Sequence, residues 1–290
     1  MSRNLLTRIA VAAVAIPIIL WIIYRGGWWL FGMVALFAVI GILEFLINEG
    51  FRPRGVSFWV GILTVAGIFY LIAEGLTPGS GGIELASFSF HIAIPLLAIA
   101  FFLVSGILFA IGSEPPDRLF ARYTRLVWGV FYIGMLYPFV FLLGETMGLS
   151  HTDSFSGGDC LLFLFGVLWV GDTAAMGVGS WIGKHRLAPA VSPGKTVEGF
   201  IGGLAGALAI AVLMMFWKFS GVPWYHVLIV ALGCSTFGQL GDLVESMWKR
   251  SLGIKDSSAV IPGHGGVLDR FDSLLFAAPF MYFYLSFIIM

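Results

Sequence analysis

The sequence has little charge for its length. Only 11% of its 290 residues are Asp, Glu, Lys or Arg, whereas 59% are hydrophobic. With a mean hydropathy of +0.97, a water-soluble domain is excluded, because most of its surface would be apolar. The short alternating segments of a transmembrane β-barrel are missing as well. Long unbroken apolar runs instead predict an all-α, polytopic integral membrane protein.

Cysteine is also scarce. Cys160 and Cys234 are the only two in the sequence, and their spacing fits no metal site, so we expect two unpaired thiols. The 16 Lys and Arg residues balance the 16 Asp and Glu residues. Net charge therefore predicts no nucleic-acid partner, and the positions of the charges are more informative than their sum.

The apolar runs predict the membrane-spanning helices. A helix needs roughly 20 apolar residues to cross the hydrocarbon of a bilayer. Nine segments meet this requirement: 5–23, 28–48, 57–74, 92–112, 126–144, 161–182, 198–217, 224–248 and 272–290. The first of them lacks a clear small-residue cleavage site, so we interpret it as a retained helix rather than a signal peptide.

The basic residues predict the orientation of these spans. If the N-terminus is cytoplasmic, all of the Lys and Arg residues except Arg25 and Lys218 fall in cytoplasmic segments. Cytoplasmic loops of membrane proteins carry this excess of positive charge. An odd number of spans then places the C-terminus outside. The compact chain with short loops suggests a bacterial inner membrane, with the working site on the cytoplasmic side.

Polar residues inside the spans are unevenly distributed. Residues 1–125 contain few of them, with Glu44 as the main exception, whereas residues 160–272 contain nearly all. We therefore expect a single membrane domain over residues 1–290. In it, residues 1–125 are mainly scaffold, and residues 160–290 provide the catalytic helices and cytoplasmic loops.

Two groups of polar residues lie in the middle of this working part. Asp172 interrupts the span 161–182 at a depth of roughly 18 Å along the helix, where a carboxylate must be neutral, paired or bound to a cation. A protonated structural Asp is the alternative.

The second group is SPGKTVEG at residues 192–199, where Ser192, Lys195 and Thr196 near a helix start suit phosphate binding. It is not a P-loop, because Pro189 occupies the position of a required Gly. A basic loop with Thr196 as N-cap is the alternative.

Two further groups follow along the chain. Asp242, Glu245 and Lys249 recur at helical spacing and share one face of a helix, although Lys249 alone would be an ordinary interfacial anchor. Asp269 and Asp272 are three residues apart, which suits carboxylate binding of one or two divalent ions. A helix N-terminus that attracts acidic residues is the alternative for this pair. Together the four groups suggest metal-assisted phosphoryl or nucleotidyl transfer between a soluble and a lipid substrate.

The segment from Ser246 to Asp272 resembles a known signature. It reads SMWKR at 246–250, KDSS at 255–258 and IPGHGGVLDRFD at 261–272, and is similar to the signature of the phosphatidate cytidylyltransferases, or CDP-diacylglycerol synthases. The blocks at 192–199 and 241–242 look like other blocks of that family. The resemblance implies cytidylyl transfer from CTP to phosphatidate, giving CDP-diacylglycerol and pyrophosphate in phospholipid biosynthesis. It also implies Mg²⁺, a monovalent cation such as K⁺ beside it, and a homodimer.

The resemblance further implies roles for individual residues. The metal ligands would be Asp242, Asp269, Asp272 and Asp172, and Lys249 would join Asp242, Asp269 and Asp272 in catalysis. The substrate-binding residues would be Ser192, Lys195, Thr196, Arg250, Lys255, Asp256, His264 and Arg270.

Three other functions share some of these features. CDP-archaeol synthases and CTP-dependent polyprenol kinases carry parts of the same signature, but the block from His264 to Asp272 favours the diacyl-lipid synthase. An ion-coupled transporter would also place acids at membrane depth. Its site should be reachable from both sides, whereas the polar groups here are predicted to lie toward one face.

Overall fold

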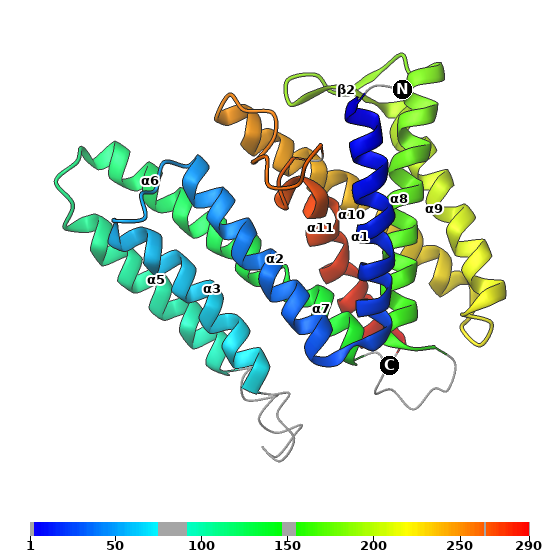
Figure 1. Ribbon diagram of the computed structural model, residues 1–290, viewed down its shortest axis with the longest axis horizontal. Coiled ribbons are helices and arrows are strands. Elements are labelled where there is room, and N and C mark those ends of the chain that lie inside the picture. Colours follow the sequence, from blue (N-terminus) through cyan, green and yellow to red (C-terminus); the bar gives the residue numbers. More distant parts are fainter. Residues whose placement is uncertain (1–2, 75–91, 147–154, 264, 290) are drawn as a thin grey trace. The chain divides into compact units, whose positions relative to one another are not determined.

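The computed structural model describes residues 3–74, 92–146, 155–263 and 265–289, and these are almost entirely helical. The helices, shown in Figure 1, are α1 (Arg3–Arg25), α2 (Gly27–Asn48), α3 (Val56–Glu74), α5 (Ile94–Ala110), α6 (Pro116–Gly129), η2 (Val130–Met135), α7 (Pro138–Thr146), α8 (Gly157–Ile182), α9 (Val197–Trp217), α10 (Trp224–Ser251), α11 (Leu268–Tyr284) and η3 (Leu285–Ile289). Two strands, β1 (Arg186–Ala188) and β2 (Ser192–Thr196), form an antiparallel hairpin.

Within these ranges, seven helices are long and apolar enough to cross a membrane. They are Gly27–Asn48, Val56–Glu74, Pro116–Glu145, Gly157–Ile182, Val197–Trp217, Trp224–Ser251 and Leu268–Ile288. Two shorter apolar helices, Ala13–Arg25 and Ile94–Ala110, lie in the remaining two predicted spans. The all-α membrane architecture is thus confirmed in outline, and the count of nine crossings stays a prediction.

The chain packs as two compact units, one of residues 1–30 and 139–290 and the other of residues 31–138. The second unit is held together by close packing of its helices. A Cβ atom at Gly129 would lie 2.3 Å from the Phe45 ring, so this contact requires glycine. In the same unit Arg125 forms an ion pair with the buried Glu49 at 3.3 Å. None of the predicted site residues belongs to this unit.

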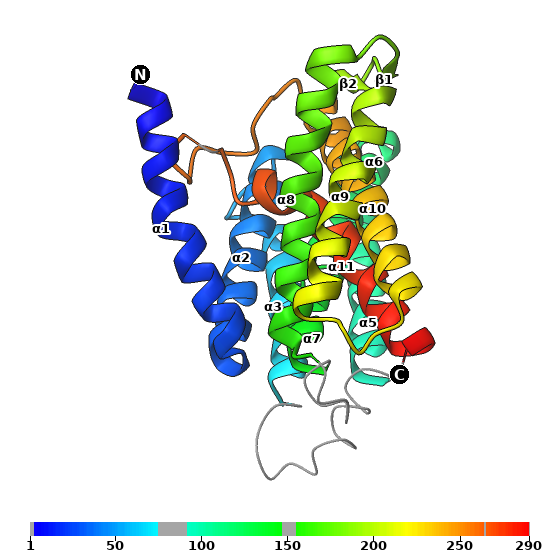
Figure 2. The same cartoon turned by 90° about the vertical axis from the view of Figure 1, so that its right-hand side faces the viewer.

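The first unit contains α8, α9, α10 and α11 side by side (Figure 2). Glycines allow their backbones to approach, as is common between membrane helices. A Cβ atom at Gly206 of α9 would lie 3.0 Å from the Val170 carbonyl oxygen of α8. A Cβ atom at Gly241 of α10 would lie 2.7 Å from the Asp272 carbonyl oxygen of α11. These close contacts bring the polar residues of the four helices within reach of one another.

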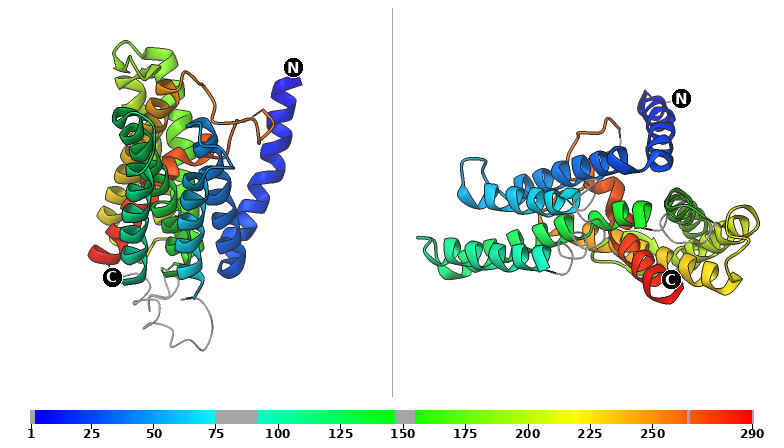
Figure 3. Two further views of the ribbon diagram at one scale, coloured as in Figure 1. Left: turned by 90° about the vertical axis from the view of Figure 1, so that its left-hand side faces the viewer. Right: turned by 90° about the horizontal axis from the view of Figure 1, so that it is seen from below.

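One end of this first unit carries the polar loops. The start of α1, the β1–β2 hairpin and the connection from α10 to α11 lie at this end, and η3 ends at the opposite one (Figures 1 and 3). The hairpin joins α8 to α9 where Gly183 leaves the helix in an extended conformation. The α10–α11 connection turns at Gly253, Gly263 and Gly265, which all have positive φ, a conformation that glycine adopts without steric cost.

Candidate functional site

A pocket of about 620 Å³ opens among α8, the hairpin, α9 and α10. Its charged lining residues are Asp172, Arg186, Lys195 and Asp242. The Lys195 Nζ lies 2.7 Å from Asp242 Oδ2, so the hairpin is tied to the middle of α10 by an ion pair. A pocket of this volume with a few convergent polar groups has the size and character of a small-molecule site.

The start of α9 explains how Lys195 and Thr196 reach this pocket. Thr196 is buried and caps α9, because its Oγ1 accepts a hydrogen bond from the Gly199 amide at 3.0 Å. The N-cap alternative for Thr196 is therefore confirmed, and the hydroxyl proton can still be donated to a ligand. Ser192, the other predicted phosphate-binding hydroxyl, begins β2 and is not part of the pocket lining.

A second cluster lies farther along α10, around the buried Lys249. Its Nζ lies 2.9 Å from Glu245 Oε2 and 2.6 Å from Asp269 Oδ1. The other oxygen of Asp269 accepts hydrogen bonds from the Ser257 amide at 2.8 Å, the Ser257 hydroxyl at 2.9 Å and the Gly266 amide at 2.8 Å. Both oxygens of Asp269 are thus occupied, and this carboxylate fastens the α10–α11 connection to α10.

Asp272 links the two clusters. Its carboxyl group interacts electrostatically with Asp242 and with Glu245, and Asp172 interacts with both Asp242 and Asp272. Three of the four predicted metal ligands, Asp172, Asp242 and Asp272, thus interact with one another, whereas the fourth, Asp269, is bonded to Lys249 in the second cluster. The carboxylates of the two clusters outnumber their lysines, so a bound cation would relieve their mutual repulsion.

The donor set fits Mg²⁺ that is shared with a substrate. In the part of the chain that the structure describes, no three Asp, Glu, His or Cys side chains form a ready-made metal cage. Mg²⁺ commonly binds through one or two carboxylates and completes its octahedron with water and substrate phosphates. Carboxylates are available for such binding, since the predicted ligands Asp172 and Asp242 both line the pocket of about 620 Å³.

The remaining predicted substrate-binding residues surround the α10–α11 connection. Asp256 and Arg270 line a pocket of about 550 Å³ there, together with Ser258 and loop glycines. Lys255 is exposed, and Arg250 donates a hydrogen bond to the Ile254 carbonyl oxygen at 2.8 Å. His264 lies outside the described residues. The predicted residues therefore divide between two neighbouring polar regions of one unit.

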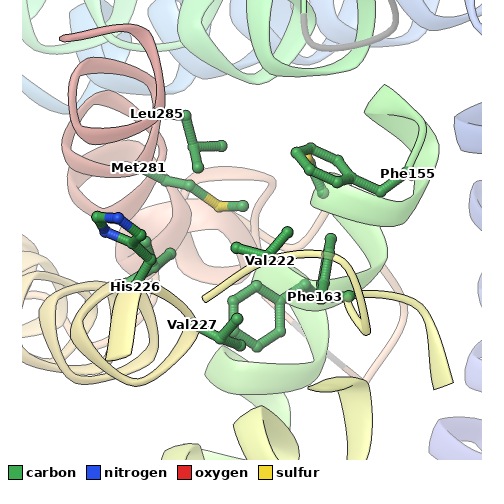
Figure 4. Close-up of a pocket in the computed structure, with 10 residues that line it drawn as sticks. Phe155, Phe163, Val222, His226, Val227, Met281 and Leu285 are labelled. Carbon is green, nitrogen blue, oxygen red and sulfur yellow. The ribbon is translucent and has the colours of Figure 1, made fainter. Parts of the chain in front are cut away.

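Another cavity in the same unit is too small and too apolar to bind a nucleotide. It measures about 20 Å³ and lies near the turn between α9 and α10, between aromatic and aliphatic side chains such as Phe163 and Met281 (Figure 4). Its polar residue, His226, is engaged through Nδ1 with the Tyr284 hydroxyl at 2.9 Å. The small volume and apolar walls exclude binding of a nucleotide here.

Sequence reasoning missed several residues that shape the site. The Glu198 carboxylate accepts hydrogen bonds from the Lys184 amide at 3.1 Å and the His185 amide at 3.2 Å, and its other oxygen lies 2.6 Å from His185 Nδ1. The sequence signal that could have identified Glu198 was its position two residues after Thr196, the N-cap of α9. Ser257 gave no such signal, because its partner Asp269 is twelve residues away across an irregular loop.

Comparison with known proteins identifies the family. The model of the cytidylyltransferase family matches residues 6–288. This chain belongs to the cytidylyltransferase family. Among its relatives, a phosphatidate cytidylyltransferase of Staphylococcus haemolyticus is 34% identical over 276 residues, which cover 94% of this chain and 96% of that protein. The phosphatidate cytidylyltransferase of Staphylococcus aureus is 33% identical over 275 residues, with the same two coverages.

A third relative matches about half of the chain. The phosphatidate cytidylyltransferase of Bacillus subtilis is 43% identical over 155 residues, which cover 53% of this chain and 55% of that protein. The resemblance that the signature residues suggested is confirmed by these relatives.

Proposed function

We propose that this protein transfers the cytidylyl group of CTP to phosphatidate, giving CDP-diacylglycerol and pyrophosphate for phospholipid biosynthesis. The observation that carries the proposal is the similarity along nearly the whole chain to relatives named phosphatidate cytidylyltransferase. The two polar regions beside α10 support it, because they combine lysines and arginines with carboxylates at one end of a membrane unit.

The reaction needs charge neutralisation and alignment more than a base. An oxygen of the phosphatidate phosphate attacks the α-phosphorus of CTP, the new O–P bond forms, and the bond to the β-phosphate oxygen breaks to release pyrophosphate. A phosphate monoester is already anionic, so no strong general base is required. Lys195 binds phosphate oxygens at the hairpin, and Arg270 and Lys255 bind those at the α10–α11 connection.

The carboxylates provide the complementary part of the site. Mg²⁺ held by Asp242, Asp172 and Asp272 would neutralise the phosphate oxygens and polarise the phosphoryl group. Asp269 joins this set only when Lys249 releases its Oδ1, since both of its oxygens are otherwise engaged. K⁺ as a second cation rests on the family resemblance.

The proposed topology has nine crossings, a cytoplasmic N-terminus and an external C-terminus in a bacterial inner membrane. Within the first unit, α1 begins at the end that carries the hairpin and η3 ends at the other, which supports an odd number of crossings (Figure 3). The site then faces the cytoplasm, where CTP is available. A homodimer rests on the resemblance and is tested by cross-linking in the membrane.

The decisive experiment supplies purified protein with Mg²⁺, CTP and one of three acceptors. With phosphatidate we expect release of pyrophosphate and formation of a CMP-linked lipid. An isoprenoid ether glycerophosphate tests the archaeal-type synthase, and a polyprenol tests the kinase, which would release CDP instead of pyrophosphate.

The controls separate the site from the rest of the chain. Asp242→Asn should abolish turnover, whereas Asp117→Asn, which changes an acidic residue of the other unit, should retain it. Failure of the wild-type protein to release pyrophosphate with phosphatidate would contradict the proposal.

A further inference from the structure

Among the described residues, Arg186 differs from Lys195 and Lys249 in having no acidic partner. Lys195 lies against Asp242 and Lys249 lies between two carboxylates. Arg186 lines the same pocket as Lys195, yet its side chain makes no ion pair or hydrogen bond to any described residue. A guanidinium beside a pocket that already contains Asp172 and Asp242 keeps its positive charge available for an incoming ligand.

The position of Arg186 is fixed by its backbone and not by its side chain. It begins β1 and pairs in register with Thr196, the N-cap of α9. One residue earlier, the His185 carbonyl oxygen accepts a hydrogen bond from the Val197 amide at 2.8 Å. The amide of His185 donates a hydrogen bond to the Glu198 carboxylate. The exposed side chain of Arg186 thus extends from a strand that pairs with β2 and whose preceding residue is bonded to the start of α9.

The chemistry of this arrangement suits phosphate. Arginine stays charged at any physiological pH, and its planar fork of N–H donors matches phosphate oxygens in a bidentate manner. We propose that Arg186 is a substrate-binding residue that contacts phosphate oxygens in the pocket lined by Lys195 and Asp242. This inference rests on the proposed cytidylyl transfer. The phosphate belongs either to the nucleotide or to the lipid headgroup.

A matched pair of variants tests this role. Arg186→Gln and Lys184→Gln each remove one positive charge from the segment that leads from α8 into the hairpin, but only Arg186 lines the pocket. We expect Arg186→Gln to raise one KM by about tenfold to a hundredfold, the effect of losing one charge-assisted hydrogen bond. Lys184→Gln should leave both KM values within about twofold, and Arg186→Lys should recover part of the loss.

The arms of the experiment identify the source of the phosphate. KM for CTP is measured at saturating phosphatidate, and KM for phosphatidate, as its mole fraction in mixed micelles, at saturating CTP. If Arg186→Gln raises the KM for CTP and weakens inhibition by pyrophosphate, the contact is assigned to the nucleotide. If it raises only the KM for phosphatidate, the contact is assigned to the lipid.

Two results would overturn the inference. One is an Arg186→Gln protein with both KM values unchanged, and the other is a loss of kcat alone together with a lower melting temperature. Calorimetric titration of the same variants with CTP and with pyrophosphate, without turnover, keeps this test separate from the proposed reaction. A wild-type protein without activity would refute the proposed reaction. The role of Arg186 would be refuted if wild type and Arg186→Gln bound CTP, pyrophosphate and phosphatidate micelles equally well.

Discussion

We expect Asp269→Asn to act mainly by loosening the α10–α11 connection, and only secondarily through any bound metal. Four donors converge on this carboxylate, with Lys249 on Oδ1 and the donors of Ser257 and Gly266 on Oδ2. An Asn side chain can keep its oxygen toward Ser257 and Gly266, but it then turns an NH₂ group toward the Lys249 ammonium. The substitution therefore removes the buried ion pair while keeping the size of the side chain.

The magnitude follows from that loss. Removing one partner of a buried ion pair costs about 3–5 kcal/mol when the other charge is left without compensation, and the lower end of about 3 kcal/mol applies here, because Lys249 keeps its contact with Glu245 at 2.9 Å. Since each 1.4 kcal/mol is a factor of about ten, opening of the connection should become more than about a hundredfold more frequent. Ser257→Ala removes one hydroxyl donor and leaves the ion pair intact, so it should have a smaller effect.

Amide hydrogen exchange measures this opening directly. The amides of Ser257 and Gly266 should exchange faster in Asp269→Asn, in parallel with a loss of pyrophosphate release. If activity disappears while both amides keep their wild-type protection, the carboxylate acts on the substrate or a metal. Our assignment of a loop-fastening role would then be refuted.

Three further perturbations test other parts of the chain. Gly129→Ala should destabilise the unit of residues 31–138 by about 1–3 kcal/mol in thermal unfolding, because the added Cβ collides with Phe45 and overpacking costs this much; an unchanged melting temperature would contradict that packing. Glu198→Ala should free the hairpin and increase its cleavage by a protease, and equal resistance would show that the Glu198 contacts are dispensable. A hydrogen bond with Asp159 raises the pKa of Lys218. The contribution of this interaction to protein stability is therefore fully present below the unfolded pKa of about 10.4, and it is lost as pH rises through the higher pKa of the folded state. The stability difference between wild type and Lys218→Gln should therefore vanish in strong alkali, and a difference that persists there would exclude this pair as its source.

The long helices could be predicted because hydropathy reports what a bilayer requires. The helix that contains the span 126–144 nevertheless begins at Pro116, ten residues earlier than expected. Its first three turns carry Arg118, Arg122 and Arg125, and a hydropathy criterion stops where such charges begin. Pro116 at the first helical position, where its missing amide costs nothing, was the overlooked start signal.

The hairpin and the contacts of the α10–α11 connection could not be predicted from sequence patterns. The strand Ser192–Thr196 reads SPGKT, which has no alternation of apolar and polar residues and contains both Pro and Gly. Its pairing depends on Glu198 and on the end of α8, which are tertiary contacts. The stripe of Asp242, Glu245 and Lys249 could be predicted because helical periodicity alone places it on one face. The partners of Asp269 could not, because an irregular loop has no period.

The glycine contacts between α8 and α9 also restrict how a lipid arrives. A Cβ atom at Gly199 would already lie 2.8 Å from the Ala175 carbonyl oxygen, and one at Gly206 would lie 3.0 Å from that of Val170. Two helices whose backbones are this close leave no gap between them that is wide enough for an acyl chain. A diacyl substrate must therefore enter along another flank of the bundle, with its tails remaining in the bilayer.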